Sequence, residues 1–195
     1  MENNKQTWWD KEIKNQFNDF KSWVGKSNAQ SKVVIRDFII KEGYKSIIDF
    51  GCGLCDDYFE YKKIPITWTG IEGSEFLYKH TQVQEIPVIK AEAHKTGLPD
   101  QSAEVAYSRH VLEHQRYYEP ILTEMIRVAS KMVIHIFFIS PRDKEIINFQ
   151  ENTNLYHNTF DRNEIFKFLE KHIKVKGFKF QQITSTEEAL IINLK

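Results

Sequence analysis

The chain has 195 residues, of which 27 are Lys or Arg and 27 are Asp or Glu, so its formal net charge is zero. This length fits one domain with a substantial core. The lack of a basic excess argues against a nucleic-acid partner.

No apolar run approaches the roughly 18 residues of a membrane span, and no secretory signal follows Met1. Only two cysteines, Cys52 and Cys55, are present, which fits a reducing compartment. We therefore expect a cytoplasmic protein that has no membrane partner.

Two helices are expected in the first 45 residues. Large apolar side chains recur there at steps of three and four residues, which is typical of one helix face. They are Trp8, Trp9, Ile13, Phe17, Phe20 and Trp23. The second helix is expected over Ser31–Glu42, where Gly43 is well placed to end it.

From Ser46 onward, short apolar strands alternate with helical segments. The expected strands are Ser46–Phe50, Ile66–Glu72, Pro87–Ala91, Glu104–Arg109 and Lys131–Ile139. The expected helices between them follow Gly51–Cys55, cover Ser74–Gln82, follow Arg109 and cover Glu119–Ala129. This alternation predicts a mostly parallel sheet with helices on both faces. A last helix over Arg162–His172 precedes an antiparallel hairpin of Lys174–Ile183 and Ala189–Leu194. The polar stretch Asp143–Thr159 shows no pattern that assigns it.

The most informative segment is a strand that ends in Asp49 and turns through Gly51, Cys52 and Gly53 into a helix. Glycines are needed where the backbone approaches a ligand without a Cβ in the way. Such a turn lies at the carboxyl end of a central strand, where open α/β sheets bind ligands.

Two acidic residues follow at the ends of the next strands. Glu72 lies 19 residues after Gly53, and a carboxylate at about this spacing can accept hydrogen bonds from the ribose hydroxyls of a nucleotide cofactor. Glu92 follows the third strand, where its carboxylate can accept from an adenine amino group. An exposed loop acid is the alternative for Glu92.

These segments together resemble the class I S-adenosylmethionine (SAM)-dependent methyltransferases, in particular the branch that acts on small molecules. The matching pieces are IIDFGCG, GIEGSE, LPDQSAEVAYSRHVLEH and EMIRV, in the family's order. The resemblance implies a Rossmann-like three-layer α/β sandwich with a mostly parallel seven-stranded sheet, whose last strand is antiparallel in the C-terminal hairpin. It also implies SAM as the cofactor and assigns Gly73, Ala93 and Arg109 to the cofactor site.

The resemblance divides one methyltransferase domain, 1–195, into three parts. Residues 1–45 are expected to form a helical cap, 46–139 the SAM-binding core, and 140–195 the acceptor-side segment and hairpin. One departure from the family is Cys55, which stands where a third glycine is common and puts the conformation of the turn in question. A non-catalytic SAM-binding or scaffold subunit is therefore the alternative function. A nicotinamide-dependent enzyme is disfavoured because Asp56 stands where that fingerprint needs a small residue.

Two further motifs invite other interpretations. Cys52 and Cys55 have the C-x-x-C spacing of redox and zinc sites, but the chain lacks a second cysteine pair. His110, Glu113 and His114 match the H-x-x-E-H pattern of a zinc-protease class. The motif directly follows a strand of the Rossmann-like alternation, so we expect no metal. Glu113 and His114 are instead expected to support the loop.

Methyl transfer asks the protein mainly to align donor and acceptor and to exclude water. A hydroxyl acceptor would also need a base. His110, at the mouth of the expected cofactor site, and His157, in a polar and aromatic segment after the fifth strand, are the candidate catalytic residues. The zero net charge favours a small molecule, including a sugar, as the acceptor. Arg109, Arg142 and Arg162 would meet an acidic acceptor, although an ordinary surface charge explains each as well. The sequence gives no indication of the oligomeric state.

Overall fold

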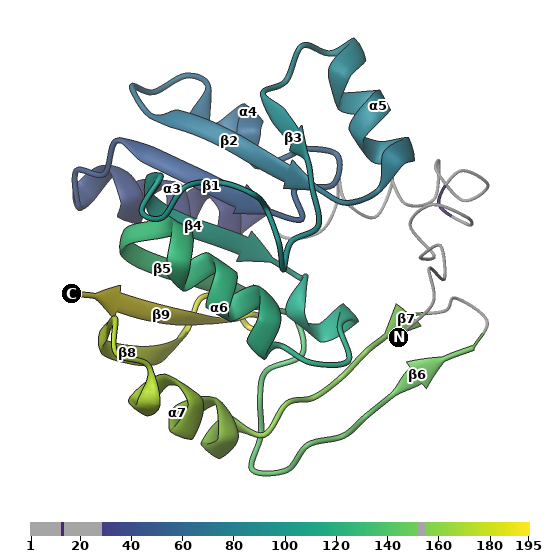
Figure 1. Cartoon of the computed structure of the whole chain (residues 1–195), viewed down its shortest axis with the longest axis vertical. Coiled ribbons are helices and arrows are strands. Elements are labelled where there is room, and N and C mark those ends of the chain that lie inside the picture. Colours follow the sequence, from purple (N-terminus) through teal and green to yellow (C-terminus); the bar gives the residue numbers. More distant parts are fainter. Residues whose placement is uncertain (1–12, 14–28, 152–154) are drawn as a thin grey trace.

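A computed structural model of the chain describes residues 13, 29–151 and 155–195 (Figure 1). The apolar helix face expected over residues 8–23 therefore lies outside the described residues, apart from Ile13. None of the helices in the described ranges is long and apolar enough to cross a membrane.

One seven-stranded sheet forms the centre of the molecule, in the order β3-β2-β1-β4-β5-β9-β8. Its strands are β1 (Ser46–Phe50), β2 (Thr67–Glu72), β3 (Val88–Lys90), β4 (Ala103–Arg109), β5 (Ala129–Phe137), β8 (Val175–Gln182) and β9 (Glu188–Leu194). The neighbours from β3 to β5 pair in parallel, and β9 runs antiparallel to both β5 and β8. The predicted class, a mostly parallel sheet with an antiparallel last strand in a terminal hairpin, is confirmed.

Helices cover both faces of this sheet. They are α3 (Ala29–Lys41), α4 (Tyr58–Tyr61), α5 (Glu75–Val83), α6 (Glu119–Val128) and α7 (Arg162–Lys171). The apolar side chains of α6 and α7 pack with one face of the strands, and those of α3 and α4 pack with the other. The strand β1 serves both cores, since Ile48 and Phe50 point to the first and Ile47 to the second.

Two predicted boundaries have clear local causes. The helix α3 ends before Gly43, which adopts a φ of +75°, and Tyr44 then donates a backbone hydrogen bond to Ile39 O at 3.2 Å. A left-handed glycine at a helix end is favourable because it has no Cβ to clash. At the start of α5, the Ser74 hydroxyl accepts from Leu77 N at 3.2 Å and caps the first turn.

The segment after β4 differs from the predicted helix. It forms only a 3₁₀ turn, Leu112–His114. The turn stays short because His110, before it, has a φ of +57° and Gln115, after it, is extended. The side chain of Glu113 also points into the core, where it contacts His135 of β5 and accepts from the backbone N–H of Phe138 just after β5.

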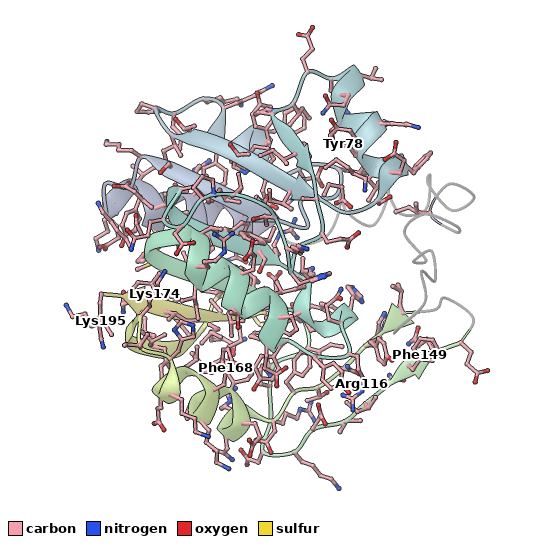
Figure 2. The ribbon with its side chains drawn as sticks, viewed as in Figure 1. Tyr78, Arg116, Phe149, Phe168, Lys174 and Lys195 are labelled. Atoms are coloured by element: carbon pink, nitrogen blue, oxygen red, sulfur yellow. The ribbon has the colours of Figure 1, made fainter. Side chains whose placement is uncertain are left out.

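The unassigned polar stretch forms an arm that carries two short antiparallel strands, β6 (Phe149–Gln150) and β7 (Leu155–Tyr156). In Figure 1 the arm extends on the side toward which the arrowheads of β1, β2 and β4 point. Figure 2 labels Phe149 on this arm and Arg116 beside it, after the 3₁₀ turn. The arm therefore lies at the edge of the sheet where the predicted site residues gather.

Candidate functional site

The glycine turn after β1 is tied to the end of β2. Gly51 N and Cys52 N both donate to Ile71 O, at 2.8 and 3.1 Å. Gly51 and Gly53 adopt φ angles of +69° and +56°. An alanine Cβ at Gly51 would lie only 2.7 Å from Val111 Cγ2, so the loop after β4 closes directly over this turn.

Cys55 takes the conformation that a glycine would take. Its φ is +60°, in the left-handed region that disfavours side chains. The turn therefore keeps a glycine-like conformation despite the departure noted in the sequence. The absence of a third glycine suggested a non-catalytic chain, but Cys55 at this position has the backbone conformation that a glycine would adopt.

The two cysteines face each other within the turn, with their Sγ atoms 3.5 Å apart. Both are free thiols, and Cys55 is fully buried. Burial, followed by the hydrogen bond with Cys55, raises the pKa of the Cys52 thiol well above its usual value. A raised pKa disfavours the thiolate that redox and zinc chemistry use. No cluster of three metal-ligating side chains occurs within the described residues.

Glu72 is held at the end of β2 by two backbone amides. Its Oε2 accepts from Gly53 N at 2.9 Å and its Oε1 accepts from Ser74 N at 2.6 Å. The residue is buried, so these two hydrogen bonds fix the direction of its carboxylate. The turn and the acid, which the sequence placed 19 residues apart, are therefore in direct contact.

Glu92 lies against the backbone that follows β2. A Cβ built on Gly73 would be 3.2 Å from Glu92 Oε2, so glycine at this position admits the carboxylate. The next residue, Ala93, is partly buried and packs on the core. Glu72, Gly73, Glu92 and Ala93 thus occupy one continuous edge of the sheet beside the glycine turn.

Asp49 and Arg109 lie in a buried cluster of charges with Asp57. Arg109 Nε and Nη2 donate to Asp57 Oδ2 at 3.1 and 2.9 Å. Asp49 Oδ2 is buried without a hydrogen-bond partner among the residues described. Burial, followed by the negative charge of Asp57, raises the pKa of Asp49 well above its usual value. Asp57, which the sequence analysis did not single out, neutralises Arg109.

The imidazole of His110 is fixed by Glu187, a residue near the C-terminal end of the chain. His110 Nε2 lies 2.7 Å from Glu187 Oε1, and the Glu187 side chain is 0% exposed. The ring of Phe138 packs edge-on against that of His110, with 5.1 Å between centroids. Glu187 lies in a polar turn, and nothing in the sequence around it indicated a partner 77 residues away.

His157, the second candidate base, also contacts Phe138, with ring centroids 5.9 Å apart. His114 contacts both of these rings, at 5.1 Å from His157 and 5.4 Å from Phe138. Burial lowers the pKa of both His114 and His157. The structure therefore brings His110 and His157 into one aromatic cluster, which we call the histidine–phenylalanine cluster (His110, His114, Phe138 and His157).

The three polar side chains of the H-x-x-E-H motif diverge. His110 contacts Glu187, Glu113 enters the core and approaches His135 at 3.2 Å, and His114 Nδ1 lies 2.9 Å from the carbonyl oxygen of Tyr156. Side chains that point to three different partners do not converge on one ion. The motif instead fastens the loop after β4 to β5, the arm and the terminal hairpin.

Residues 48–137, from β1 to the end of β5, match the family described as "Methyltransferase domain". This segment is therefore a methyltransferase domain, and the fold of the described residues is that of solved SAM-dependent methyltransferases. Curated protein sequences give no match.

Solved methyltransferase structures share the fold at low sequence identity. The 1,6-didemethyltoxoflavin-N1-methyltransferase of Burkholderia thailandensis aligns with a TM-score of 0.69 and 12% identity, over 95% of this chain and 86% of that one. The magnesium protoporphyrin IX methyltransferase of Synechocystis PCC 6803 aligns with a TM-score of 0.68 and 13% identity, over 93% and 95% of the two chains. Both were solved with S-adenosylhomocysteine bound.

The residues of this methyltransferase fit SAM as its cofactor. SAM carries a cationic sulfonium and an ammonium group, and the unpartnered Asp49 Oδ2 is a buried acceptor that a nearby cation would stabilise. The fixed carboxylate of Glu72 is an acceptor whose chemistry suits the hydroxyl groups of the cofactor.

Replacing Gly51 with alanine should lower the free energy of unfolding by about 2 to 3 kcal/mol, because the new Cβ meets both a positive φ and Val111. Chemical denaturation measures this loss. Gly43→Ala is the matched control, since Gly43 also has a positive φ but nothing lies within 4 Å of its added Cβ. A second change, Val111→Ala, should restore part of the loss at Gly51. Equal losses at Gly51 and Gly43 would contradict the close packing of the turn.

Proposed function

We propose that this methyltransferase transfers the SAM methyl group to a small-molecule acceptor at the carboxyl edge of the sheet. The observation that carries the proposal is the Glu72 carboxylate, fixed by Gly53 N and Ser74 N beside the glycine turn. The cofactor residues that we propose are Asp49, Gly51, Cys52, Gly53, Glu72, Gly73, Glu92, Ala93 and Arg109. Arg109 takes part through its pairing with Asp57, which balances charge beneath the turn.

SAM would supply an electrophilic methyl carbon on a sulfonium. An acceptor nucleophile would attack this carbon in line, and S-adenosylhomocysteine would be the leaving group. The protein's task is then to orient the acceptor, keep water out and remove a proton where the acceptor has one. We propose His110 as the base and His157 as the second candidate, since both belong to the histidine–phenylalanine cluster. Burial lowers the pKa of His157, which keeps its ring neutral and able to accept a proton near pH 7.

A neutral small molecule fits the charges of the described residues better than an acidic one. Two of the three arginines considered for an acidic acceptor are already paired, Arg109 with Asp57 and Arg162 with Glu188. The two structural neighbours are methyltransferases of small molecules, 1,6-didemethyltoxoflavin and magnesium protoporphyrin IX. We propose a neutral sugar or ring compound as the acceptor class, with no nucleic-acid partner.

We also propose the division into a cap (1–45), a SAM-binding core (46–139) and an acceptor-side segment with the hairpin (140–195). Ile13 supports it, because this residue of the cap is fully buried in a small cluster with Leu54 of the turn, Leu77 of α5 and Leu155 of the arm. Parts of all three segments therefore meet next to the glycine turn. We also propose a cytoplasmic location, because the chain has only two cysteines and so no disulfide framework.

Calorimetric titration with SAM and S-adenosylhomocysteine tests the cofactor site. Glu72→Ala should weaken binding tenfold or more, which is about 1.4 kcal/mol, because it removes the carboxylate and releases two backbone amides. Glu75→Ala is the matched control, since Glu75 is a partly exposed acid that pairs with Lys79 on the surface of α5. Binding that Glu72→Ala leaves unchanged would refute this site.

The acceptor is then found by measuring S-adenosylhomocysteine formation from SAM over a panel of sugars, phenols and heteroaromatic compounds. Turnover with one chemical class identifies the acceptor. Binding of SAM without turnover on any compound of the panel would contradict the proposed small-molecule acceptor.

A further inference from the structure

The turn between β8 and β9 places a buried carboxylate on the imidazole of His110. Glu187 Oε1 and His110 Nε2 are 2.7 Å apart, and the carboxylate side chain is 0% exposed while the ring is 20% exposed. One side of the ring thus faces the protein interior. A buried acid in contact with a partly exposed histidine is an arrangement that controls which ring nitrogen carries the proton.

The Glu187 carboxylate is itself held in place by hydroxyl groups. Ser31 Oγ donates to Oε1 at 3.3 Å, and Thr184 Oγ1 donates to Oε2 at 3.3 Å. The backbone around it is fixed as well, because Glu187 N donates to Thr184 Oγ1 at 3.1 Å. These donors come from α3 and from the hairpin turn, so two separate segments hold one carboxylate.

The backbone of His110 is also constrained. Its φ of +57° lies in the left-handed region, which is uncommon for a residue with a side chain and is found at functional sites. His110 N donates to Ile136 O at 2.9 Å, which fastens this conformation to β5. The edge-on contact with Phe138 then limits rotation of the ring.

From this geometry we infer that Glu187 is a positioning residue that sets the tautomer of His110. A carboxylate can only accept, so Nε2 carries the proton and Nδ1 keeps the lone pair. The inference rests on the proposed function for the role of that lone pair. For a hydroxyl acceptor, the O–H bond breaks and its proton goes to Nδ1. The oxygen electron pair forms the new O–C bond as the methyl C–S bond breaks onto sulfur. The positive charge left on the imidazole then faces the Glu187 carboxylate.

Nitrogen NMR of the ¹⁵N-labelled protein, with S-adenosylhomocysteine added, reads the tautomer directly. His110 is assigned by the signal that disappears in His110→Ala. We expect the Nε2–H form to exceed the Nδ1–H form by tenfold or more in the unaltered protein, since a hydrogen bond to a charged group is the stronger kind. In Glu187→Gln the amide can donate or accept, so the ratio should fall several-fold, and Glu187→Asp should restore part of it.

Glu188→Gln is the matched control, because it makes the same chemical change one residue along the chain. Glu188 bonds to Arg162 Nη2 at 2.6 Å, away from His110. The His110 tautomer should therefore stay as in the unaltered protein. A dominant Nδ1–H form in the unaltered protein would overturn the inference even if Glu187→Gln does not fold. An unchanged ratio in a folded Glu187→Gln would also overturn it.

The proposed function is tested by measurements other than the tautomer ratio. Loss of SAM binding in calorimetry, or full turnover in His110→Ala, would refute the cofactor site or the base while leaving the tautomer ratio as measured. The expected fall of the tautomer ratio in Glu187→Gln, together with full turnover in His110→Ala, would mean that Glu187 positions a ring that the reaction does not use.

Discussion

Replacing Glu113 with alanine should lower the free energy of unfolding by about 2 to 6 kcal/mol, because it leaves two buried donors without their acceptor and each costs about 1 to 3 kcal/mol. The Glu113 side chain is 0% exposed. Its Oε1 accepts from Phe138 N at 2.7 Å, and its Oε2 lies 3.2 Å from His135 Nε2. The other ring nitrogen of His135 is 2.6 Å from Ser108 Oγ. Alanine would leave a backbone amide and a histidine without their partner inside the core.

The same network should make stability fall in acid. Burial lowers the pKa of His135. Burial alone would raise the pKa of Glu113, but the hydrogen bond and charge of His135 outweigh it and lower that pKa. The folded state therefore holds both protons more weakly than the unfolded chain does. Their contribution is complete above the ordinary histidine pKa of 6.5. It declines as the pH falls below 6.5 for His135 and below 4.5 for Glu113.

Urea denaturation at pH 7.5 and at pH 5.5 measures both effects. Glu170→Ala is the surface control, since Glu170 is an exposed acid on α7, and it should change stability by no more than about 0.5 kcal/mol. In His135→Asn the loss of stability between the two pH values should be smaller than in the unaltered protein. A loss below about 1 kcal/mol for Glu113→Ala would show that this network contributes little to stability.

The sequence predicted the sheet well because its strands are short, apolar and separated by turn residues. The strand β5 is buried on both faces, and its sequence is correspondingly an almost continuous apolar run. The glycine turn and Glu72 were predictable for a second reason: both lie at strand ends, and parallel neighbours bring their ends together. Local pattern and sheet geometry together were enough for this part of the site.

The contacts that complete the site span too much of the chain for local patterns to predict. Arg109 and Asp57 are 52 residues apart, and His110 and Glu187 are 77 apart. Each contact depends on which strands become neighbours and on the side to which the following loops turn. The arm was not assigned because its two strands have two residues each, too few to show an alternating pattern.

Replacing His110 with alanine should lower the turnover rate about 100-fold or more, the usual contribution of a positioned general base. The affinity for SAM should stay within about twofold, because the residues that we propose to hold the cofactor are elsewhere along the sheet edge. His110→Ala leaves Val111 and its contact with Gly51 in place, so the loop after β4 should keep its position against the glycine turn. Initial rates with the acceptor found by the panel, together with calorimetry, separate the two quantities.

His157→Ala is the companion variant that decides between the two histidines. Both rings contact Phe138, but only His110 has a buried carboxylate behind it, Glu187, which can stabilise the positive charge that a base acquires. We therefore expect the ring of His157 to contact the acceptor without taking its proton. His157→Ala should then raise the KM for the acceptor and lower kcat by less than tenfold. A large fall in kcat for His157→Ala, with His110→Ala unaffected, would reverse the assignment and make His157 the base.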